Sequence, residues 1–260
     1  MFGFKRRRRE RLRRQPFPSE WEAILARNVA YYRLLPADAQ AELRGHIQVL
    51  VAEKNWEGCG GLAMTDEIKV TIAGQAAVLL LHRDTDYFPE LRSILVYPNA
   101  FVAPTEEEDL GDGPLEGEDV HFGQSWDWGT VVLSWRHALR GAQYRDDGDN
   151  LILHEFAHQL DHEDGVTNGA PLLDDEEAQA EWGRVLSGEY EQLWSDVEHN
   201  RRTLIDDYGA TDPTEFFAVV TECFFERPHA LQQRHPELYG VLQQFYRQDP
   251  AALRDAAQQQ

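Results

Sequence analysis

The stretch LILHEFAHQLDHE, residues 151–163, decides the fold. It contains the pattern His-Glu-x-x-His at His154, Glu155 and His158. The spacing of its apolar residues predicts a helix over about residues 150–162. Residues four apart lie on one face of a helix, so both imidazoles can reach a single ion. We therefore expect this helix to carry a metal site.

The spacing gives the three polar side chains different roles. His154 and His158 are predicted ligands of zinc, the usual metal of such sites, which keeps an open position for water. Glu155 is about 100° around the helix from His154, so it reaches the zinc-bound water rather than the metal. Zinc lowers the pKa of that water and polarises a carbonyl, while Glu155 takes the proton and passes it to the leaving amine. The pattern thus predicts a zinc-dependent peptidase.

The five-residue pattern also occurs on surface helices, where two histidines merely lie near an acid. A surface helix would not carry so many apolar side chains around the pattern. The dense apolar residues here favour a buried helix and hence catalysis: Ile152, Leu153, Phe156, Ala157 and Leu160.

A third zinc ligand has to be found as well. His162 lies on the same helix face, but three ligands from one straight helix seldom converge on one ion. Asp164 holds the third-ligand position of the extended pattern HExxHxxGxxH, but Asp161 replaces the glycine that this pattern needs for its turn. The remaining choice is a glutamate from a later helix, Glu215 or Glu222.

The segment DPTEFFAVVTECFFE, residues 212–226, predicts this later helix over about residues 213–226. Glu215 and Glu222 are seven residues apart and share one face of it. Glu215 also has capping-box spacing from the aspartate that starts the segment, so it could bond only the backbone. Glu222 could instead orient a histidine ligand through its free ring nitrogen. The residues alone leave the choice open, and Asp161 is a second candidate for the orienting role.

Charge is distributed unevenly along the 260 residues. The net charge is −21, but residues 5–14 carry eight Lys/Arg against Glu10, which gives +7 there and −28 for the remainder. Such an acidic body argues against nucleic-acid binding by the body, since that binding rests on cations that neutralise phosphates. We expect residues 1–16 to be a basic, disordered arm. This arm could also contact RNA, DNA or an anionic membrane, or fold back on the acidic body.

Other bulk features place the protein in the cytoplasm. No window approaches the roughly 18 apolar residues of a membrane span, and no apolar segment of a secretory signal follows the basic start. Cys59 and Cys223 are the only cysteines, so a disulfide framework is not indicated.

Residues 17–260 are predicted to form a single domain of the α+β class, mainly helical with a small sheet. Strands are expected over residues 93–97 and 129–135, a turn over 56–62, an apolar helix from Thr65-Asp66 to Leu81, and a mobile acidic loop over 105–119. The second strand is either an edge along which an extended peptide pairs or an ordinary core strand.

Three segments together resemble the glucose-regulated metallopeptidase family. They are HEFAHQLD (154–161), DDYGATDPTEFFAVVTECFFE (206–226) and HPELYGVLQQFYRQDP (235–250). Upstream, VTIAGQAAVLLL, SILVYPNAF and GTVVLSW also match the style of this family. The resemblance spans roughly residues 17–250 and is far more specific than the five-residue pattern.

The resemblance implies a gluzincin-type site with one zinc ion on His154, His158 and Glu215, and with Glu155 as base. It also implies a zincin-like catalytic domain related to that of anthrax lethal factor. In that arrangement a tyrosine seven residues before the glutamate ligand, here Tyr208, faces the site. Its hydroxyl would donate a hydrogen bond to the developing oxyanion. The alternative is a half-buried aromatic ring that is hydrogen-bonded elsewhere.

The family also implies partners. They are a peptide or protein substrate, cleaved with aminopeptidase-like activity, and a transcriptional repressor of the Mlc type that controls sugar phosphotransferase genes. The arginine-rich arm and the very acidic body depart from familiar members. Two rival functions remain: a regulator-binding module with a vestigial or structural zinc site, and a metallohydrolase acting on a non-peptide substrate.

Overall fold

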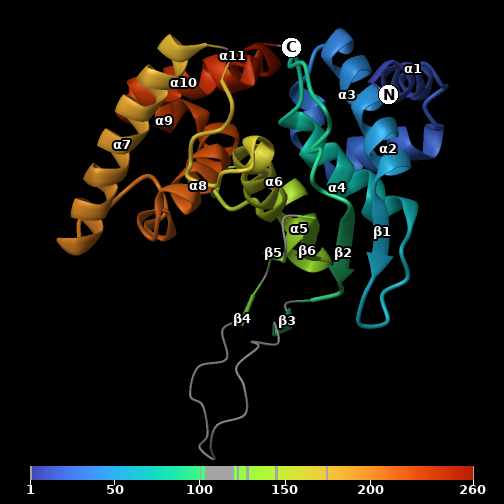
Figure 1. The fold of residues 1–260 in the computed structure, drawn as a ribbon, viewed down its shortest axis with the longest axis horizontal. Coiled ribbons are helices and arrows are strands. Elements are labelled where there is room, and N and C mark those ends of the chain that lie inside the picture. Colours follow the sequence, from blue (N-terminus) through green and yellow to red (C-terminus); the bar gives the residue numbers. More distant parts are fainter. Residues whose placement is uncertain are drawn as a thin grey trace, which may run out of the picture.

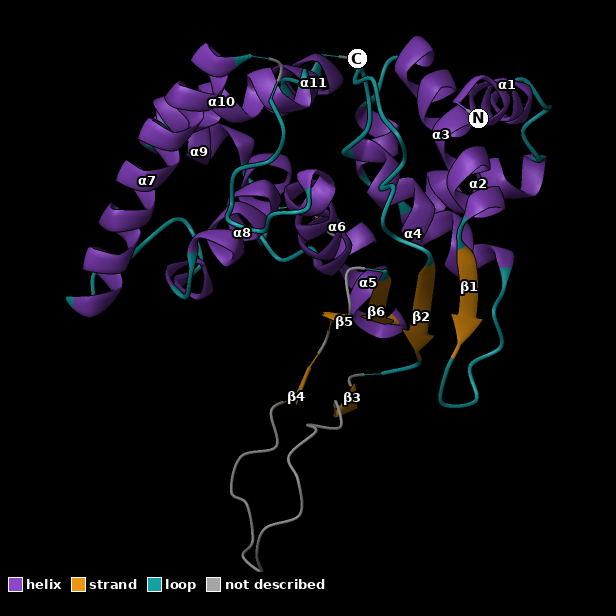
Figure 2. Ribbon diagram, in the orientation of Figure 1, coloured by secondary structure: helices purple, strands orange, loops and turns teal. Residues whose placement is uncertain are grey.

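The computed structural model describes residues 2–99, 101–102, 120–121, 123–126, 129–143, 146–173 and 175–259. The expected acidic loop over residues 105–119 lies outside them. The chain is α+β and mainly helical, as predicted (Figure 2). The α-helices are α1 (Phe2–Arg13), α2 (Ser19–Asn28), α3 (Ala37–Glu53), α4 (Asp66–Val78), α5 (Trp135–Gln143), α6 (Leu151–Asp161), α7 (Glu176–Glu198), α8 (Pro213–Glu226), α9 (Pro228–Arg234), α10 (Pro236–Tyr246) and α11 (Pro250–Gln258). Three short 3-10 helices are η1 (Tyr31–Leu34), η2 (His162–Asp164) and η3 (Asp207–Ala210).

The main sheet has the strand order β1-β2-β6-β5, in which β1, β2 and β6 are parallel and β5 is antiparallel to β6. A separate antiparallel pair is formed by β3 and β4. The strands are β1 (Asn55–Gly58), β2 (Ser93–Tyr97), β3 (Phe101–Val102), β4 (Val120–His121), β5 (Gly123–Trp126) and β6 (Thr130–Ser134). The strand predicted over residues 93–97 is confirmed as β2.

The structure decides between the two alternatives for one strand and differs from one expectation. The strand β6 lies between β2 and β5, so residues 129–135 do not form an edge and the core-strand alternative holds. Residues 56–58, the start of the turn expected over 56–62, belong instead to β1, and the turn proper comes at Gly60 and Gly61. The sequence NWEG has no apolar alternation to mark a strand. Its extended backbone results from parallel pairing with β2, with Asn55 opposite Ser93.

The helix α4 packs closely in the centre of the N-terminal half. Its N-cap is Thr65, as predicted, and the Thr65 hydroxyl accepts a hydrogen bond from the N–H of Ile68. A Cβ atom at Gly74 would lie only 2.9 Å from Cδ2 of Leu25 on α2. Glycine therefore allows α2 and α4 to approach each other at this point.

Figure 1 shows α6 in the middle of the molecule, between the N-terminal helices α1–α4 and the C-terminal helices α7–α11. Its apolar face is fully covered, since no more than 1% of the surface of Ile152, Phe156, Ala157 or Leu160 is exposed. The helix that carries His154, Glu155 and His158 is therefore held rigidly by the core.

Within the described residues, no helix combines the length and the apolar character needed to cross a bilayer.

The N-terminal arm departs from the prediction of a disordered tail over residues 1–16, because α1 packs against α3 (Figure 1). Arg9 is the centre of this contact. Its Nε donates a hydrogen bond to Oε2 of Glu53 at 2.9 Å, and its guanidinium also pairs with Asp86. The same group lies over the ring of Tyr87, 4.6 Å from the centroid. Acidic groups of the body thus give the arginine-rich segment a place to fold back, which was the alternative expectation.

Replacing Arg9 with alanine tests this docking. Arg9 is 9% exposed, and its loss leaves the buried carboxylate of Glu53 with one cation fewer. We expect Arg9→Ala to lower the free energy of unfolding by about 2 kcal/mol and to speed amide exchange in α1. The control is Arg6→Ala, because Arg6 is largely exposed and its ion pair is with Glu10 on its own helix. Equal exchange rates in the two variants would contradict the docking.

Candidate metal centre

The helix α6 begins at a capped and buried residue, Asn150. Oδ1 of Asn150 accepts a hydrogen bond from the N–H of Leu153, and Nδ2 donates one to Oε1 of Glu226 at 3.0 Å. The backbone N–H of Asn150 donates to Oε2 of Glu222. These bonds tie the start of α6 to α8 and set the direction in which His154 projects, one turn later.

The helix α8 spans the residues over which the later helix was expected, and its N-cap is Asp212. Oδ1 of Asp212 accepts hydrogen bonds from the N–H groups of Thr214 and Glu215, at 2.8 and 3.0 Å. The cap is therefore made without the carboxylate of Glu215. That carboxylate lies instead against the rings of His154 and His158.

The loop after η2 holds the end of α6 against the start of α8. Oδ2 of Asp161 accepts a hydrogen bond from the N–H of Gly169 at 2.9 Å, and the carbonyl of Gly169 accepts one from Nε1 of Trp182. Gly169 has a φ of 75°, and a Cβ atom there would lie 2.3 Å from the carbonyl oxygen of Pro213. Only glycine permits so close an approach to the first turn of α8.

Three side-chain atoms converge between α6 and α8. Oε2 of Glu215 lies 3.0 Å from Nε2 of His154 and 3.5 Å from Nε2 of His158. The two Nε2 atoms are 3.2 Å apart. Zinc with bonds of roughly 2.0–2.2 Å in tetrahedral geometry separates its ligand atoms by about 3.3 Å. The three atoms are thus spaced as the ligands of one ion are.

Polar atoms that lack protein partners also fit a metal ion at this position. Oε2 of Glu215 is buried and has no aligned hydrogen-bond donor among the described residues. A buried carboxylate oxygen in this state is costly unless a cation satisfies it. The donor set of two imidazoles and one carboxylate is the set found in thermolysin-type zinc sites. The residues present therefore fit zinc.

The other ring nitrogen of His154 is held by Glu222. Nδ1 of His154 lies 2.7 Å from Oε1 of Glu222. A carboxylate that accepts the Nδ1–H fixes the tautomer of the imidazole, so that the Nε2 lone pair points to the three-atom cluster. The geometry favours Glu215 over Glu222 as the third ligand, because Glu222 touches the far side of the ring. The sequence alone did not distinguish these two glutamates as the third ligand.

Charge in the cluster perturbs the proton affinities of its members. Burial lowers the pKa of the His154 imidazole, but the carboxylates of Glu215 and Glu222 outweigh burial and raise it well above the usual range. Burial raises the pKa of Glu215, but both histidines outweigh it and hold the pKa far below its usual value. The carboxylates therefore favour positive charge at the His154 ring, which a metal ion can supply in place of a proton.

Two further residues predicted for the site, Glu155 and Tyr208, lie beside the group of His154, His158 and Glu215. Glu155 is 4% exposed, and burial raises the pKa of its carboxyl above the usual range, although His154 and His158 oppose this shift. Tyr208, in η3, is 54% exposed, and its ring centroid lies 6.1 Å from that of His154. Burial of its hydroxyl, together with the charge of Glu215, raises the pKa of Tyr208 to about 12. Its phenol is therefore neutral near pH 7 and can donate a hydrogen bond.

The other residues considered as ligands do not join the cluster. Nδ1 of His162 lies 3.0 Å from Oγ1 of Thr167, and Oδ1 of Asp164 accepts a hydrogen bond from the N–H of Val166. Asp161 holds the loop through Oδ2, while its Oδ1 is buried with no hydrogen-bond partner among the described residues. The orienting role of Asp161 therefore stays a prediction.

Sequence reasoning missed two residues that support the centre, Asn150 and Glu226. An N-cap signal was available for Asn150, because asparagine precedes the apolar run of α6. No signal existed for Glu226. It is buried at the last position of α8, and its partner Asn150 is 76 residues away in the sequence.

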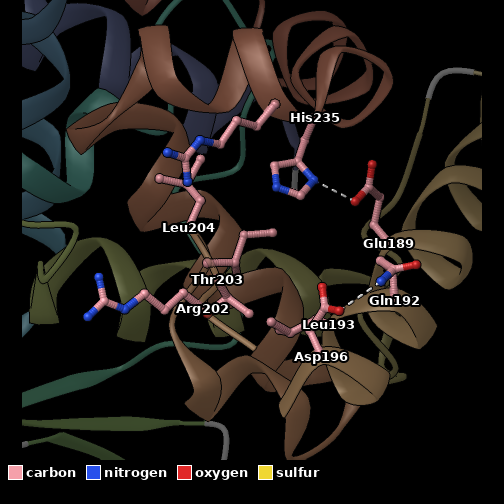
Figure 3. Close-up of a pocket in the computed structure, with 10 residues that line it drawn as sticks. Glu189, Gln192, Leu193, Asp196, Arg202, Thr203, Leu204 and His235 are labelled. Atoms are coloured by element: carbon pink, nitrogen blue, oxygen red, sulfur yellow. Dashed lines mark hydrogen bonds and ion pairs between the residues drawn. The ribbon is translucent and has the colours of Figure 1, made fainter. Parts of the chain in front are cut away.

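A small cavity of about 120 Å³ lies elsewhere, between α7, residues 202–205 and the start of α10 (Figure 3). Its polar groups pair with each other: Nδ1 of His235 lies 2.7 Å from Oε2 of Glu189, and Gln192 donates to Asp196. None of the proposed metal ligands lines it. This cavity therefore does not belong to the metal centre.

Comparison with known proteins shows the family of the chain. The model of the family described as "Glucose-regulated metallo-peptidase M90" matches residues 4–247. The chain therefore belongs to the glucose-regulated metallopeptidase family, and a metallopeptidase family implies a bound metal ion.

Individual relatives extend the comparison. Protein slr2042 of Synechocystis sp. is 40% identical over 244 residues, which cover 94% of this chain and 89% of that protein. The protein named Mlc titration factor A from Pectobacterium atrosepticum is 34% identical over 194 residues, 74% of this chain and 72% of its own length. Its namesake from Serratia proteamaculans is 30% identical over 239 residues, 90% and 88% of the two chains.

Two isosteric substitutions distinguish the third ligand from the orienting carboxylate. We expect Glu222→Gln to weaken zinc affinity about 10–100-fold, the usual effect of losing a group that orients a ligand. Glu215→Gln should weaken it more, because a neutral amide replaces an anionic ligand. Competition with a chromophoric chelator measures both, and Glu237→Gln, at an exposed position of α10, is the control. A larger loss for Glu222→Gln would make Glu222 the ligand.

Proposed function

We propose that this protein is a zinc-dependent peptidase that hydrolyses peptide bonds at the centre between α6 and α8. The observation that carries the proposal is the convergence of His154, His158 and Glu215 within 4.8 Å of one another, next to the buried Glu155. Membership of a metallopeptidase family supports the same reaction class.

The donor set favours a catalytic zinc over a structural one. Structural zinc sites use four protein ligands, whereas catalytic sites use three and leave a position open. Among the described residues only three side chains form the candidate group. A structural site would also have no use for the buried carboxylate of Glu155. When bound, zinc lowers the pKa of water and polarises a peptide carbonyl.

In the proposed reaction Glu155 is the general base and then the general acid. It takes a proton from the attacking water and delivers it to the nitrogen of the leaving amine. The raised pKa of its carboxyl brings the proton affinity nearer to the working pH, which suits both steps. The same burial excludes bulk water from the proton that is transferred.

Tyr208 is proposed to stabilise the negative charge that develops on the carbonyl oxygen. Its ring lies near His154, and its neutral hydroxyl can donate a hydrogen bond. A donor aimed at the oxyanion contributes only as charge builds up, so it accelerates the chemical step rather than substrate binding.

The substrate is proposed to be an extended peptide. The strand β5 contacts α6 and is the last strand of the main sheet on that side, among the described residues. An extended segment that pairs with β5 would lie along α6 through main-chain hydrogen bonds. The aminopeptidase-like preference, and a relation to the catalytic domain of anthrax lethal factor, follow from the sequence resemblance and remain part of the proposal.

A repressor of the Mlc type is proposed as a second partner. The support is the name that several relatives share, Mlc titration factor A. Capture of a repressor does not need Glu155, so the two activities are separable.

A cytoplasmic setting is proposed on the ground that Cys59 and Cys223 are both free thiols.

Glu155→Gln tests the peptidase proposal. The isosteric amide cannot accept the proton, so we expect kcat/KM on aminoacyl-nitroanilide and peptide substrates to fall about 10²–10⁴-fold with zinc content unchanged. Chelation of zinc from the wild-type protein should abolish the same activity. The control Glu191→Gln changes an exposed glutamate of α7 and should leave kcat/KM unaltered.

The alternatives predict other results for the same panel. If the zinc-loaded wild-type protein cleaves no peptide, while Glu155→Gln binds a repressor normally, the regulator-binding module replaces the peptidase. Hydrolysis of esters or other non-peptide substrates alone would point to a different metallohydrolase.

Tyr208→Phe tests the oxyanion role. We expect kcat to fall about 10²-fold while KM and zinc affinity change little, since the hydroxyl acts in the transition state. Tyr190→Phe is the control, because the Tyr190 hydroxyl donates a hydrogen bond to the carbonyl of Ala210 and does not belong to the group of His154, His158 and Glu215. An equal loss in both variants, or a change in KM alone, would remove Tyr208 from the mechanism.

A further inference from the structure

The cations on the inner face of α1 form ion pairs with acidic residues of the body of the protein. Nζ of Lys5 lies 3.0 Å from Oδ1 of Asp86, and Nη1 of Arg8 lies 2.8 Å from Oε1 of Glu53. Arg9 pairs with both of these carboxylates. The body therefore uses two acidic residues to hold three cations of the arm.

The outer face of α1 is different. Phe4, Arg7, Arg11 and Arg14 follow one another at spacings of three, four and three residues, which places them along one stripe of a helix. We call these four residues the outer stripe. All four are exposed, and Phe4 is 79% exposed. Arg14 continues the line in the turn after the helix, where its N–H bonds the carbonyl of Arg11.

The arginines of the outer stripe have no side-chain partner among the residues that the structure describes. This is notable in a chain with 46 acidic and 25 basic residues, where acidic partners are abundant. The apolar ring of Phe4, in the same stripe, is also exposed to water, with which it has no favourable interaction. Unpaired cations in line with an exposed aromatic ring suit a partner that is anionic and can also take an apolar side chain.

We propose that the outer stripe binds the surface of an anionic phospholipid bilayer. Arginines next to such a surface are attracted by lipid headgroups, and a phenylalanine ring inserts at the boundary between headgroups and acyl chains. Figure 1 shows α1 at the periphery of the molecule and α6 in its middle, so this contact leaves the metal centre accessible.

The exposed ring of Phe4 favours a bilayer over a nucleic acid. A bilayer surface offers anionic headgroups to the arginines and an apolar interior to the ring, whereas the backbone of a duplex offers phosphates alone. Because α3 and the segment around Asp86 cover the inner face of α1, the outer stripe meets its partner side-on, as a helix lying in the plane of a bilayer does. The acidic body repels both kinds of partner, but charges beyond about 8 Å are largely screened at physiological salt. The interaction is accordingly peripheral and sensitive to salt.

Flotation of the full-length protein with vesicles tests the proposal. Vesicles of phosphatidylcholine with roughly 30% phosphatidylglycerol should bind the protein at low salt, whereas pure phosphatidylcholine should not. Each arginine near the surface contributes about fivefold, so the triple variant Arg7→Glu/Arg11→Glu/Arg14→Glu should bind at least about 100-fold more weakly. Phe4→Ser should weaken binding several-fold even at low salt.

A matched variant distinguishes binding through the outer stripe from an effect of net charge alone. Arg136→Glu/Arg202→Glu/Arg234→Glu makes the same charge change at exposed arginines of α5, the segment before η3, and α9, and should bind vesicles as the wild type does. All variants should keep the zinc content and the melting temperature of the wild type, because every substituted residue is exposed.

Two outcomes would overturn the proposal. They are no binding of the wild type to anionic vesicles at low salt, and equal losses in the stripe variant and the matched variant. Binding to duplex or single-stranded RNA together with the first outcome would assign the outer stripe to nucleic acid instead. None of these readouts depends on peptidase activity, so the test is independent of the proposed function.

Discussion

Between α6 and α8, Nδ1 of His154 and a carboxylate oxygen of Glu222 lie 2.7 Å apart, while Oε2 of Glu215 faces the opposite nitrogen of the same ring at 3.0 Å. One imidazole is thus held between two carboxylates of a neighbouring helix. The register of α6 against α8 must be fixed to within a fraction of an ångström for both contacts to exist. Asn150 and Gly169 supply that register at the two ends of α6, and the apolar core holds it.

The same contact explains which parts of the centre could be predicted. His154, Glu155 and His158 are local on one helix, so spacing alone reveals them. Glu215 and Glu222 share a face of α8 and are chemically equivalent in sequence. Only the tertiary arrangement separates them, because α8 presents Glu215 to the inner side of the His154 ring and Glu222 to its outer side.

The elements of the fold also divide into those that local sequence signals predict and those that depend on distant residues. The strand over residues 93–97 and the cap at Thr65 were predictable, since apolar runs and capping residues are local signals. The strand over residues 55–58 and the helix over 2–13 were not. Both depend on partners distant in sequence, a parallel strand in one case and the carboxylates of Glu53 and Asp86 in the other. Acidic residues of the body thus give the basic arm its structure.

Anomalous diffraction at the zinc edge, from crystals of the zinc-loaded protein, shows whether His154, His158 and Glu215 hold one zinc ion. We expect one anomalous peak per chain, about 2.0–2.2 Å from Nε2 of both histidines and from a carboxylate oxygen of Glu215, with Glu222 bonded to Nδ1 of His154. A peak coordinated by Glu222, or one located away from α6, would show that these three residues do not form the zinc site.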